Sequence, residues 1–393
     1  MSYQSCRAII PKFQWKHIIE YISYNNIVKM NLIDFSFNTL IDENTGRCNF
    51  LEHRTDAIVV VKCDTHYMDY FWKYALQNYI SCGNINELFQ YFEDDIKHNT
   101  TMIHYKVFIR IGVYPYDNYA YNNNGYAYRS YNFSENLCSI EINGSKSGST
   151  TIIFTNDKII DYYALSAVIP KYFSIKHIIF RNMSCTFVKH QYDAGKSNCL
   201  TDDKFVSTYA DATLHINNCV FEGSHADLAI DSINKASIIN CIFDARLHIS
   251  NGISFGRSIE SRMHKLGLTN NIECSISHST FSIKSPKDGC IDIYSELPHS
   301  INFTNNLVLK AATLFYDGIF NKNTAFQVSN NTISNMDMCV QCCRDIKFVS
   351  NHFDGVMALY DDSSSNITID DTNTFINCDE QLMNQIKIEN ISQ

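Results

Sequence analysis

Asp202, Asp203 and His225 are the residues whose types and spacing come closest to a catalytic group. Carboxylates and imidazoles commonly transfer protons in enzymes. The interval from Asp203 to His225 equals the interval at which a similar segment recurs later in this chain. If that interval is one turn of a repeating β-structure, the two side chains stack about 4.8 Å apart, as neighbouring strands do. Thr-Asp-Asp-Lys is also ordinary turn sequence, so we expect surface loop residues here and keep acid–base catalysis as the alternative.

Three cysteines, Cys339, Cys342 and Cys343, form a C-x-x-C-C cluster with His352 downstream. A structural zinc site needs four ligands, usually supplied as two close pairs, and no second cysteine pair is close in the sequence. We therefore expect these thiols to act as small buried residues. Neither a metal nor another cofactor is expected.

Residues 114–131 read YPYDNYAYNNNGYAYRSY and are dense in tyrosine and asparagine. Tyrosine offers a large contact area at a low cost in side-chain entropy, so we expect an insertion loop that contacts a partner protein. A surface loop without a partner, or stacking of the rings on sugars, are the alternatives. The candidate contacts at the start of this stretch are Tyr114, Tyr116, Tyr119 and Tyr121.

These residues need a scaffold, and the sequence repeats itself in a way that predicts one. Residues 214–223 read LHINNCVFEG and residues 236–245 read ASIINCIFDA, which match when Asn218 is aligned with Asn240. In a longer series, a polar residue precedes a large apolar one by three positions: Ser184 and Phe187, Asn218 and Phe221, Asn240 and Phe243, His278 and Phe281, Asn305 and Val308, Asn330 and Ile333, Ser350 and Phe353, Thr372 and Phe375. The spacing of the apolar positions is shortest between Ile333 and Phe353 and longest between Phe243 and Phe281, which indicates a coil with insertions.

Each repeat contains a short alternating segment, such as Leu214 and Ile216, that fits a strand and is too short for a helix. Such strands must stack on their equivalents in the next repeat, which predicts parallel sheets wound into a solenoid. Asparagine at the bend tolerates left-handed backbone and can bond to the asparagine stacked on it. Cys219 and Cys241 are in phase, so we expect a ladder of thiols and no disulfide.

The stretches VFIRIGVY (107–114), CSIEINGSKSGSTTIIF (138–154) and FSIKHIIFRNMSCTF (173–187) resemble the first coils of the pectin-lyase-like superfamily. The resemblance covers roughly residues 106–378 and implies a mostly β fold, a right-handed parallel β-helix, after a small α-helical N-terminal region. Many enzymes of that superfamily cut polysaccharides with aligned carboxylates. The polygalacturonase motifs occur here only as displaced fragments, and we expect no enzyme activity.

That superfamily caps its first coil with an amphipathic helix. Residues 84–98, NINELFQYFEDDIKH, place Leu88, Phe89, Phe92 and Ile96 at helical spacing. Asn84 is the expected N-cap because Glu87 stands three residues later, and Asn86 is the alternative. The predicted organisation is a segment 1–45, a capping α region 46–105, the solenoid 106–380 and a tail 381–393.

Residues 10–41 do not fit the coil pattern and resemble an F-box. Ile10 and Pro11 stand at its Leu-Pro position, and short helices would carry Ile18, Ile22 and Leu32. The resemblance implies that these five residues dock onto the SKP-type adaptor subunit of a cullin-RING ubiquitin ligase, while the solenoid chooses an unknown protein substrate. The alternative is a helical cap that buries the same residues against the solenoid end.

The net charge of −9 and the pI near 5.8 predict neither nucleic acid nor an anionic membrane as a partner. No signal peptide or long apolar run is visible, so we expect a cytoplasmic protein with free thiols. The Asn, Ile, Lys and Tyr content resembles that of large DNA viruses of amoebae, which would place it in the host cytoplasm. A non-enzymatic recognition protein is the leading expectation; a carbohydrate-active hydrolase or lyase and a structural, virion-associated solenoid are the alternatives.

Overall fold

The computed structural model describes somewhat more than half of the chain. The described residues are 41–42, 47–48, 57–63, 79–98, 103–116, 119–120, 127–128, 130–132, 137–146, 148–154, 165–168, 172–182, 184–188, 213–223, 227–231, 235–244, 246–250, 272–283, 289–294, 299–317, 324–341, 343–361 and 364–392. The segment with Ile10, Pro11, Ile18, Ile22 and Leu32 lies outside them.

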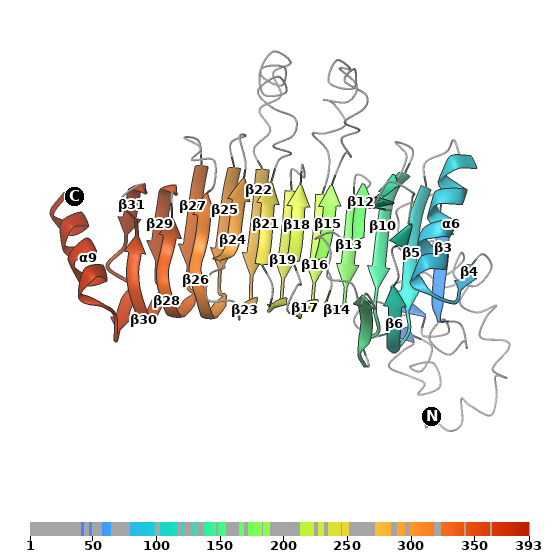
Figure 1. Ribbon diagram of the computed structural model, residues 1–393, viewed down its shortest axis with the longest axis horizontal. Coiled ribbons are helices and arrows are strands. Elements are labelled where there is room, and N and C mark those ends of the chain that lie inside the picture. Colours follow the sequence, from blue (N-terminus) through green and yellow to red (C-terminus); the bar gives the residue numbers. More distant parts are fainter. Residues whose placement is uncertain are drawn as a thin grey trace, which may run out of the picture.

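The described part is mostly β, and its strands stand side by side in one long row between two helices (Figure 1). One sheet has 12 strands, all paired in parallel except for the antiparallel β3 and β4 at its amino-terminal end. In sheet order these strands are β31 (Ser365–Ile369), β29 (Arg344–Val349), β27 (Thr324–Ser329), β25 (His299–Thr304), β22 (Ile272–Ser277), β19 (Lys235–Ile239), β16 (Thr213–Asn217), β13 (Tyr172–Lys176), β10 (Leu137–Asn143), β5 (Ile103–Ile109), β3 (Ile58–Cys63) and β4 (Tyr79–Cys82).

The second sheet has 16 strands and consists of two parallel runs that join. The first run is β6 (Gly112–Tyr116), β11 (Thr150–Phe154), β14 (Ile179–Arg181), β17 (Val220–Glu222), β20 (Ile242–Phe243) and β23 (Thr280–Ser282). The second run is β9 (Ser130–Asn132), β12 (Leu165–Val168), β15 (Ser184–Val188), β18 (Asp227–Asp231), β21 (Arg246–Ser250) and β24 (Gly289–Tyr294). Both runs pair with the 11-residue β26 (Leu307–Asp317), which β28 (Thr332–Gln341), β30 (His352–Tyr360) and β32 (Thr374–Ile376) follow.

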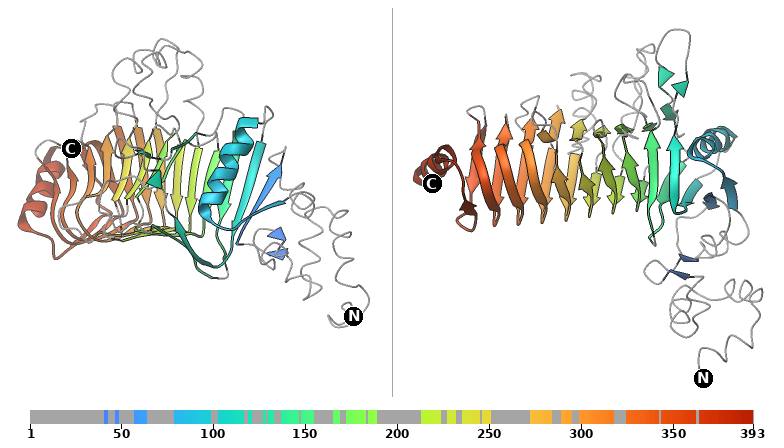
Figure 2. Two further views of the ribbon diagram at one scale, coloured as in Figure 1. Left: turned by 45° about the vertical axis from the view of Figure 1, so that its right-hand side comes forward. Right: turned by 60° about the horizontal axis from the view of Figure 1, so that its bottom comes forward.

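Each coil therefore alternates between the two sheets, as a parallel solenoid does, and Figure 2 shows the stacked coils from two further sides. Two short antiparallel pairs lie outside this pattern: β1 (Ile41–Asp42) with β2 (Arg47–Cys48), and β7 (Tyr119–Ala120) with β8 (Ala127–Tyr128). The capping region also differs from the expected α structure, since it contributes β3 and β4 to the 12-stranded sheet.

The corners after the strands from β13 to β29 of the 12-stranded sheet have the left-handed backbone conformation that the repeat predicted for its asparagine bends. Asn218 and Asn240 have φ of 53° and 54°, and the corners His278, Asn305, Asn330 and Ser350 share this conformation. Asparagine adopts it at low cost because its short polar side chain can bond locally. In the first coil of the series the prediction was wrong: His177 is the corner and Phe180 follows it, whereas Phe187 lies in β15 and pairs with Ile230.

The apolar anchors stack from coil to coil. Phe221 pairs with Phe243 on the neighbouring strand, with ring centroids 5.1 Å apart and planes within 6°. The stack continues to Phe180 on one side, at 5.1 Å, and to Phe281 on the other, at 4.8 Å. All four side chains are at most 2% exposed. Burying an aromatic ring stabilises the fold by roughly 2 kcal/mol or more through the hydrophobic effect, and ring pairing adds to this.

The amide ladder lies one position beyond the predicted one. The buried residues that directly follow the corners are Asn306, Asn331, Asn351 and Asn373, and the side-chain oxygens of the last three each accept a hydrogen bond from the backbone N–H of the preceding ladder residue at 2.8–3.0 Å. In the earlier coils Cys219 occupies this position, followed by Cys241 and then Ser279. Both thiols are free, as the ladder prediction required.

Helices cover the two ends of the row. The helix α6 (Ile85–His98) buries Leu88, Phe89 and Phe92 against the first coil, and Asn84 caps it. The Asn84 Oδ1 atom accepts the Glu87 N–H at 2.9 Å, and Glu87 in return accepts the Gly83 N–H. The predicted tail forms α9 (Glu380–Ser392). Neither of these two helices has the length and apolar character needed to span a membrane.

Candidate functional site

The outward face of the 12-stranded sheet carries rows of polar and charged side chains. Alternate residues of each strand point into the core, so the other side chains form rows that run along the solenoid. Through its strand pairing, the middle row joins Lys106, Glu141, Ser174, His215, Ser237, Ser275 and Asn302. These positions are set by strand register, which is why separate segments of sequence meet here.

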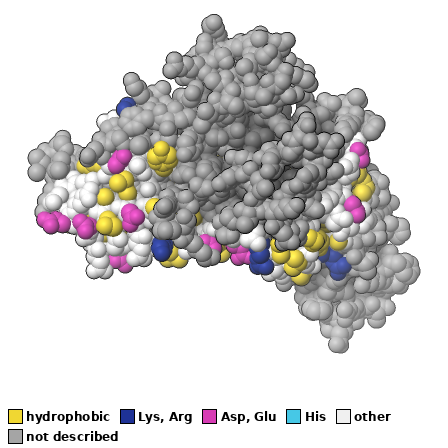
Figure 3. Space-filling view, in the orientation of Figure 1, with side chains coloured by type: hydrophobic (Ala, Val, Ile, Leu, Met, Phe, Trp, Pro, Cys, Tyr) yellow, Lys and Arg dark blue, Asp and Glu magenta, His cyan; other side chains and the backbone are white. Residues whose placement is uncertain are grey.

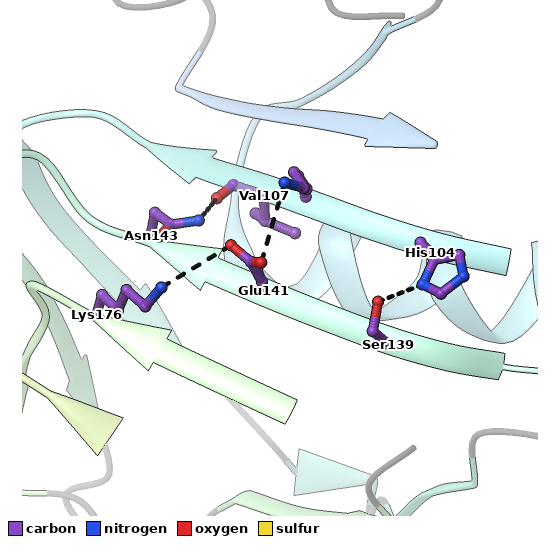
Figure 4. Close-up of polar contacts among 7 residues, drawn as sticks. His104, Val107, Ser139, Glu141, Asn143 and Lys176 are labelled. Atoms are coloured by element: carbon purple, nitrogen blue, oxygen red, sulfur yellow. Dashed lines mark hydrogen bonds and ion pairs between the residues drawn. The ribbon is translucent and has the colours of Figure 1, made fainter. Parts of the chain in front are cut away.

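A charged cluster lies at the amino-terminal end of this face (Figure 4). The Glu141 carboxylate on β10 lies 4.0 Å from the Lys106 ammonium on β5 and 4.0 Å from the Lys176 ammonium on β13. Their side chains are 14%, 8% and 28% exposed, respectively. The low solvent exposure strengthens these attractions, and both gaps exceed direct hydrogen-bond length, so water can bridge them.

Beside this cluster, the His104 Nδ1 atom and the Ser139 hydroxyl are 2.6 Å apart. A serine bonded to an imidazole is the geometry of an activated nucleophile. Ser139 is only 3% exposed, however, so a substrate carbonyl has no open path to its oxygen. Asn143, on the same strand, donates to the Val107 carbonyl at 3.3 Å and so ties β10 to β5. This arrangement positions side chains and does not expose a nucleophile.

Tyr172 and His215 lie between the cluster and the middle of the face. Their ring centroids are 5.2 Å apart. Burial lowers the pKa of His215, and the nearby Lys176 ammonium lowers it further, against the opposing effect of Glu141. Burial also raises the pKa of Tyr172, as does the Glu141 carboxylate. At neutral pH both side chains are therefore uncharged and can donate and accept hydrogen bonds.

A groove of about 490 Å³ lies next to His215, over β16, β19, β22 and β25. Half of the ten described residues that line it carry a hydroxyl or amide side chain, namely Thr213, Ser237, Ser275, Ser300 and Asn302. The others are His215, Lys235, Ala236, Glu273 and Cys274. Lys235 and Glu273 form an ion pair of 3.6 Å across two strands, with side chains 64% and 61% exposed. An ion pair this exposed contributes little to stability, so both groups can turn to a ligand.

Between β5 and β25, Glu141 and Glu273 are the acidic residues on the described part of this face. Four strand spacings separate them, which is about 19 Å. The two carboxylates of glycoside hydrolases lie roughly 5–9.5 Å apart. The described groups of this face therefore do not form a pair that could cleave a glycosidic bond.

Several predicted site residues fall outside the described part of the chain. These are the acid–base candidates Asp202, Asp203 and His225, the loop residue Tyr121 and the cluster residue Cys342. Of the residues expected in the tyrosine-rich loop, Tyr119 lies in the hairpin strand β7. Its pairing with Tyr128 on β8 is antiparallel.

Tyr114 and Tyr116 correct the prediction of a contact loop that begins at residue 114. Both lie in β6, where they are 8% and 0% exposed, so they are core residues and offer no contact surface. The Tyr114 hydroxyl donates to the Ala57 and Arg110 carbonyls at 3.2 Å. Burial raises the pKa of Tyr114. Tyrosine content indicated a surface, but alternation along the strand places these two rings inside.

Cys339 and Cys343 are buried free thiols, as expected for core residues. His352 lies on β30, where its Nδ1 atom is 2.8 Å from the Thr374 hydroxyl. Within the described ranges, no three His, Cys, Asp or Glu side chains converge in a way that could hold a metal ion.

Sequence reasoning missed the cluster of Lys106, Glu141, Lys176 and His215. Each of these residues lies in a short alternating segment, such as the Glu of SIEIN, and that signal marks it as outward-facing. The strand register that brings the four together cannot be read from one sequence, because insertions of different length separate the coils. No protein-family model matches the chain, and comparison with curated proteins and with solved structures finds no similar protein.

Proposed function

We propose that this chain is a non-enzymatic recognition protein, a right-handed parallel β-helix that presents the groove over β16, β19, β22 and β25 to a protein partner. The groove carries the proposal because its size suits a ligand, and its hydroxyl, amide and charged side chains can form hydrogen bonds with one. Its volume of about 490 Å³ lies within the usual range of binding sites, and four in-register strands give it a rigid floor.

The charges of the face favour binding over catalysis. Glu141 lies between two ammonium groups, and Glu273 is paired with Lys235. Each carboxylate is therefore engaged by an ammonium group of the same face, and neither lies near a second carboxylate with which it could share acid–base catalysis. The exposed Lys235–Glu273 pair can instead exchange its internal contact for contacts with both charge types on a partner protein.

The front of the chain extends the proposal. Its resemblance to an F-box supports docking of Ile10, Pro11, Ile18, Ile22 and Leu32 onto an SKP-type adaptor subunit in the cytoplasm. The groove would then select the substrate that the ubiquitin ligase modifies. Carbohydrate binding is a second candidate, because the hydroxyl and amide side chains of the groove also match the hydrogen-bonding groups of a sugar.

Cross-linking through Lys235 tests the groove directly. An amine-reactive cross-linker applied to the full chain in its host extract should join Lys235 to a specific partner protein, identified by mass spectrometry. Ser275→Trp, which fills the groove, should abolish that cross-link, whereas Thr368→Trp, at an exposed position on the distant β31, should retain it. If no protein is captured and glycan binding is found that Ser275→Trp abolishes, the carbohydrate candidate replaces the protein partner.

A separate measurement tests the front segment. The wild-type chain should co-elute with a purified SKP-type adaptor in gel filtration, and Ile18→Asp combined with Ile22→Asp should remove this association without affecting the Lys235 cross-link. An adaptor that never co-elutes with the wild-type chain would contradict the ligase assignment and leave the groove proposal standing.

A further inference from the structure

The first run of the 16-stranded sheet has an outward face of its own, away from the groove. Its strand pairing aligns a row of outward residues from β6 to β32: Val113, Thr151, Ile179, Val220, Ile242, Thr280, Leu307, Thr332, His352 and Thr374. Val113, Ile242 and Leu307 are 62%, 49% and 37% exposed. Figure 3 shows separate patches of hydrophobic side chains among charged ones along the lower edge of the molecule, the largest toward its right-hand end. Such a row is typical of a protein interface.

In the next outward row, charged residues at equal distances on the two sides of β23 have opposite signs. Arg181 stands three strands before β23 and Asp354 three strands after it. Asp244, directly after β20, stands one strand before β23, and Lys310 on β26 stands one strand after it. Thus these two charges on one side of β23 each have an opposite charge at the same distance on the other side. Glu222, two strands before β23, is the exception: it pairs with Arg181 at 2.6 Å, and the residue two strands after β23 is Ser334.

If a second copy lies against this face with its solenoid running in the opposite direction, each of these charges meets a residue of opposite charge on the other copy. We propose that two copies of this chain pack through this face, with a twofold axis beside Ser282 on β23. Arg181 of each copy then faces Asp354 of the other, and Asp244 faces Lys310. The same arrangement sets Ile242 against Leu307, the exposed aliphatic residues on either side of β23. An isologous contact of this kind is the commonest form of protein dimer.

The dimensions of the face suit such a dimer. With the axis at β23, the overlap extends from β11 to β32, which is eight strand spacings or about 38 Å. Val113 on β6 lies beyond this overlap, so Ile242 and Leu307 are the exposed aliphatic residues that the contact covers. The strands that belong to this run alone have two to five residues and most have three, which is about 10 Å, so the flat overlap is on the order of 400 Å² per copy. Standard protein interfaces bury about 800 Å² of accessible surface per partner. Protruding side chains make the accessible surface of this face larger than its flat projection. The groove lies on the other sheet and stays open in the dimer.

The mass of the full chain in solution tests the proposal. Sedimentation at about 10 µM should give twice the monomer mass of 45.2 kDa. Lys310→Asp should raise the dimer dissociation constant at least tenfold, because it sets like charges against Asp244. Adding Asp244→Lys should restore dimerisation, since the double exchange re-creates the complementary pattern, whereas a mere loss of folding could not be rescued in this way.

The axis can be located independently. With a bismaleimide that spans about 8 Å, Ser282→Cys should give more cross-linked homodimer than the wild-type chain, whose native thiols set the background, because residues on the axis meet their own equivalents. The matched control Gln381→Cys, exposed at the far end of the chain, should stay at the wild-type background on a denaturing gel. A chain that stays monomeric at about 50 µM, or a dimer indifferent to Lys310→Asp, would overturn the proposal.

Discussion

The corner of the solenoid is built differently in its carboxyl-terminal and amino-terminal halves. In the carboxyl-terminal half, Asn306, Asn331, Asn351 and Asn373 form a buried ladder in which each amide also donates to a main-chain carbonyl of the preceding coil at 2.8–2.9 Å. In the amino-terminal half, the same place holds thiols, and the phenylalanine rings stack without a break from Phe180 to Phe281.

The difference teaches that backbone geometry, and not the ladder residue, defines the corner. Asn218 and Asn330 share nearly the same φ, 53° and 56°, although a cysteine follows the first and an asparagine the second. A buried thiol needs little hydrogen bonding, so ring stacking and burial can stabilise the early coils. A buried amide must be bonded on all sides, so the late coils depend on an unbroken chain of partners.

The largest effect should come from breaking the ring stack. Phe243→Ala removes a fully buried ring that touches neighbours on both sides, and we expect the free energy of unfolding to fall by about 4 kcal/mol. Val220→Ala, which trims an outward side chain of the same face, is the matched control and should cost under about 1 kcal/mol. Urea unfolding followed by circular dichroism gives both values, and equal losses would contradict a stacked core.

Breaking the amide ladder should cost somewhat less, with a clear contrast between the halves. Asn331→Ala leaves the Asn306 N–H and the Phe303 carbonyl without their partners, and about 3 kcal/mol should be lost. Cys241→Ala removes only a thiol, and about 1 kcal/mol should be lost. The same urea experiment compares them. If the two variants are equally destabilised, the two halves do not differ as described.

Extending the asparagine ladder by one coil, at Ser279, should give a small gain in stability. The Ser279 N–H already donates to Asn306 at 2.9 Å, and its hydroxyl accepts the Cys241 N–H at 3.1 Å. Ser279→Asn keeps an acceptor there and adds an amide that can reach the preceding coil, so stability should rise by about 1 kcal/mol. Ser279→Leu, of similar size and without the acceptor, should be destabilised. A gain in the leucine variant would show that packing alone decides this position.

The smallest effect concerns pH and the face of the early coils. Because burial and Lys176 lower the pKa of His215, the folded chain binds the His215 proton less well than the unfolded chain does. Its contribution to stability is therefore complete above about pH 6.5 and is lost as the pH falls through the lower folded pKa. His215→Gln should flatten the fall in stability below about pH 6.5, measured by urea unfolding at each pH. An unchanged slope would contradict the lowered pKa.

The local features of this fold could be predicted from the sequence alone. The matching Asn218 and Asn240 predicted the left-handed corner, and the spacing of Asn84 and Glu87 predicted the helix cap. These succeed because turn and cap preferences depend on a few neighbouring residues. The pair of Ser184 and Phe187 fitted the same pattern but belongs to another strand, since a polar residue three positions before an apolar one is common in any β-structure.

The outward face could not be predicted in the same way. Glu141 and Lys176 meet only because β10 and β13 pair in a register that leaves both at the same end. The long insertions between coils hide that register from any fixed repeat distance. The burial of Tyr116 likewise follows from the place of β6 beneath α6, which composition alone does not reveal.

The spacing of the coils is the most direct test of the whole account. Spin labels attached through ketone-bearing residues at positions 113 and 307, which are exposed, avoid the native thiols. Six strand spacings separate β6 from β26. Pulsed electron–electron double resonance, with unlabelled protein in excess, should therefore give a narrow distribution centred at about 29 Å. A broad distribution, or one centred beyond about 40 Å, would show that these coils do not stack and would remove the groove and the dimer face together.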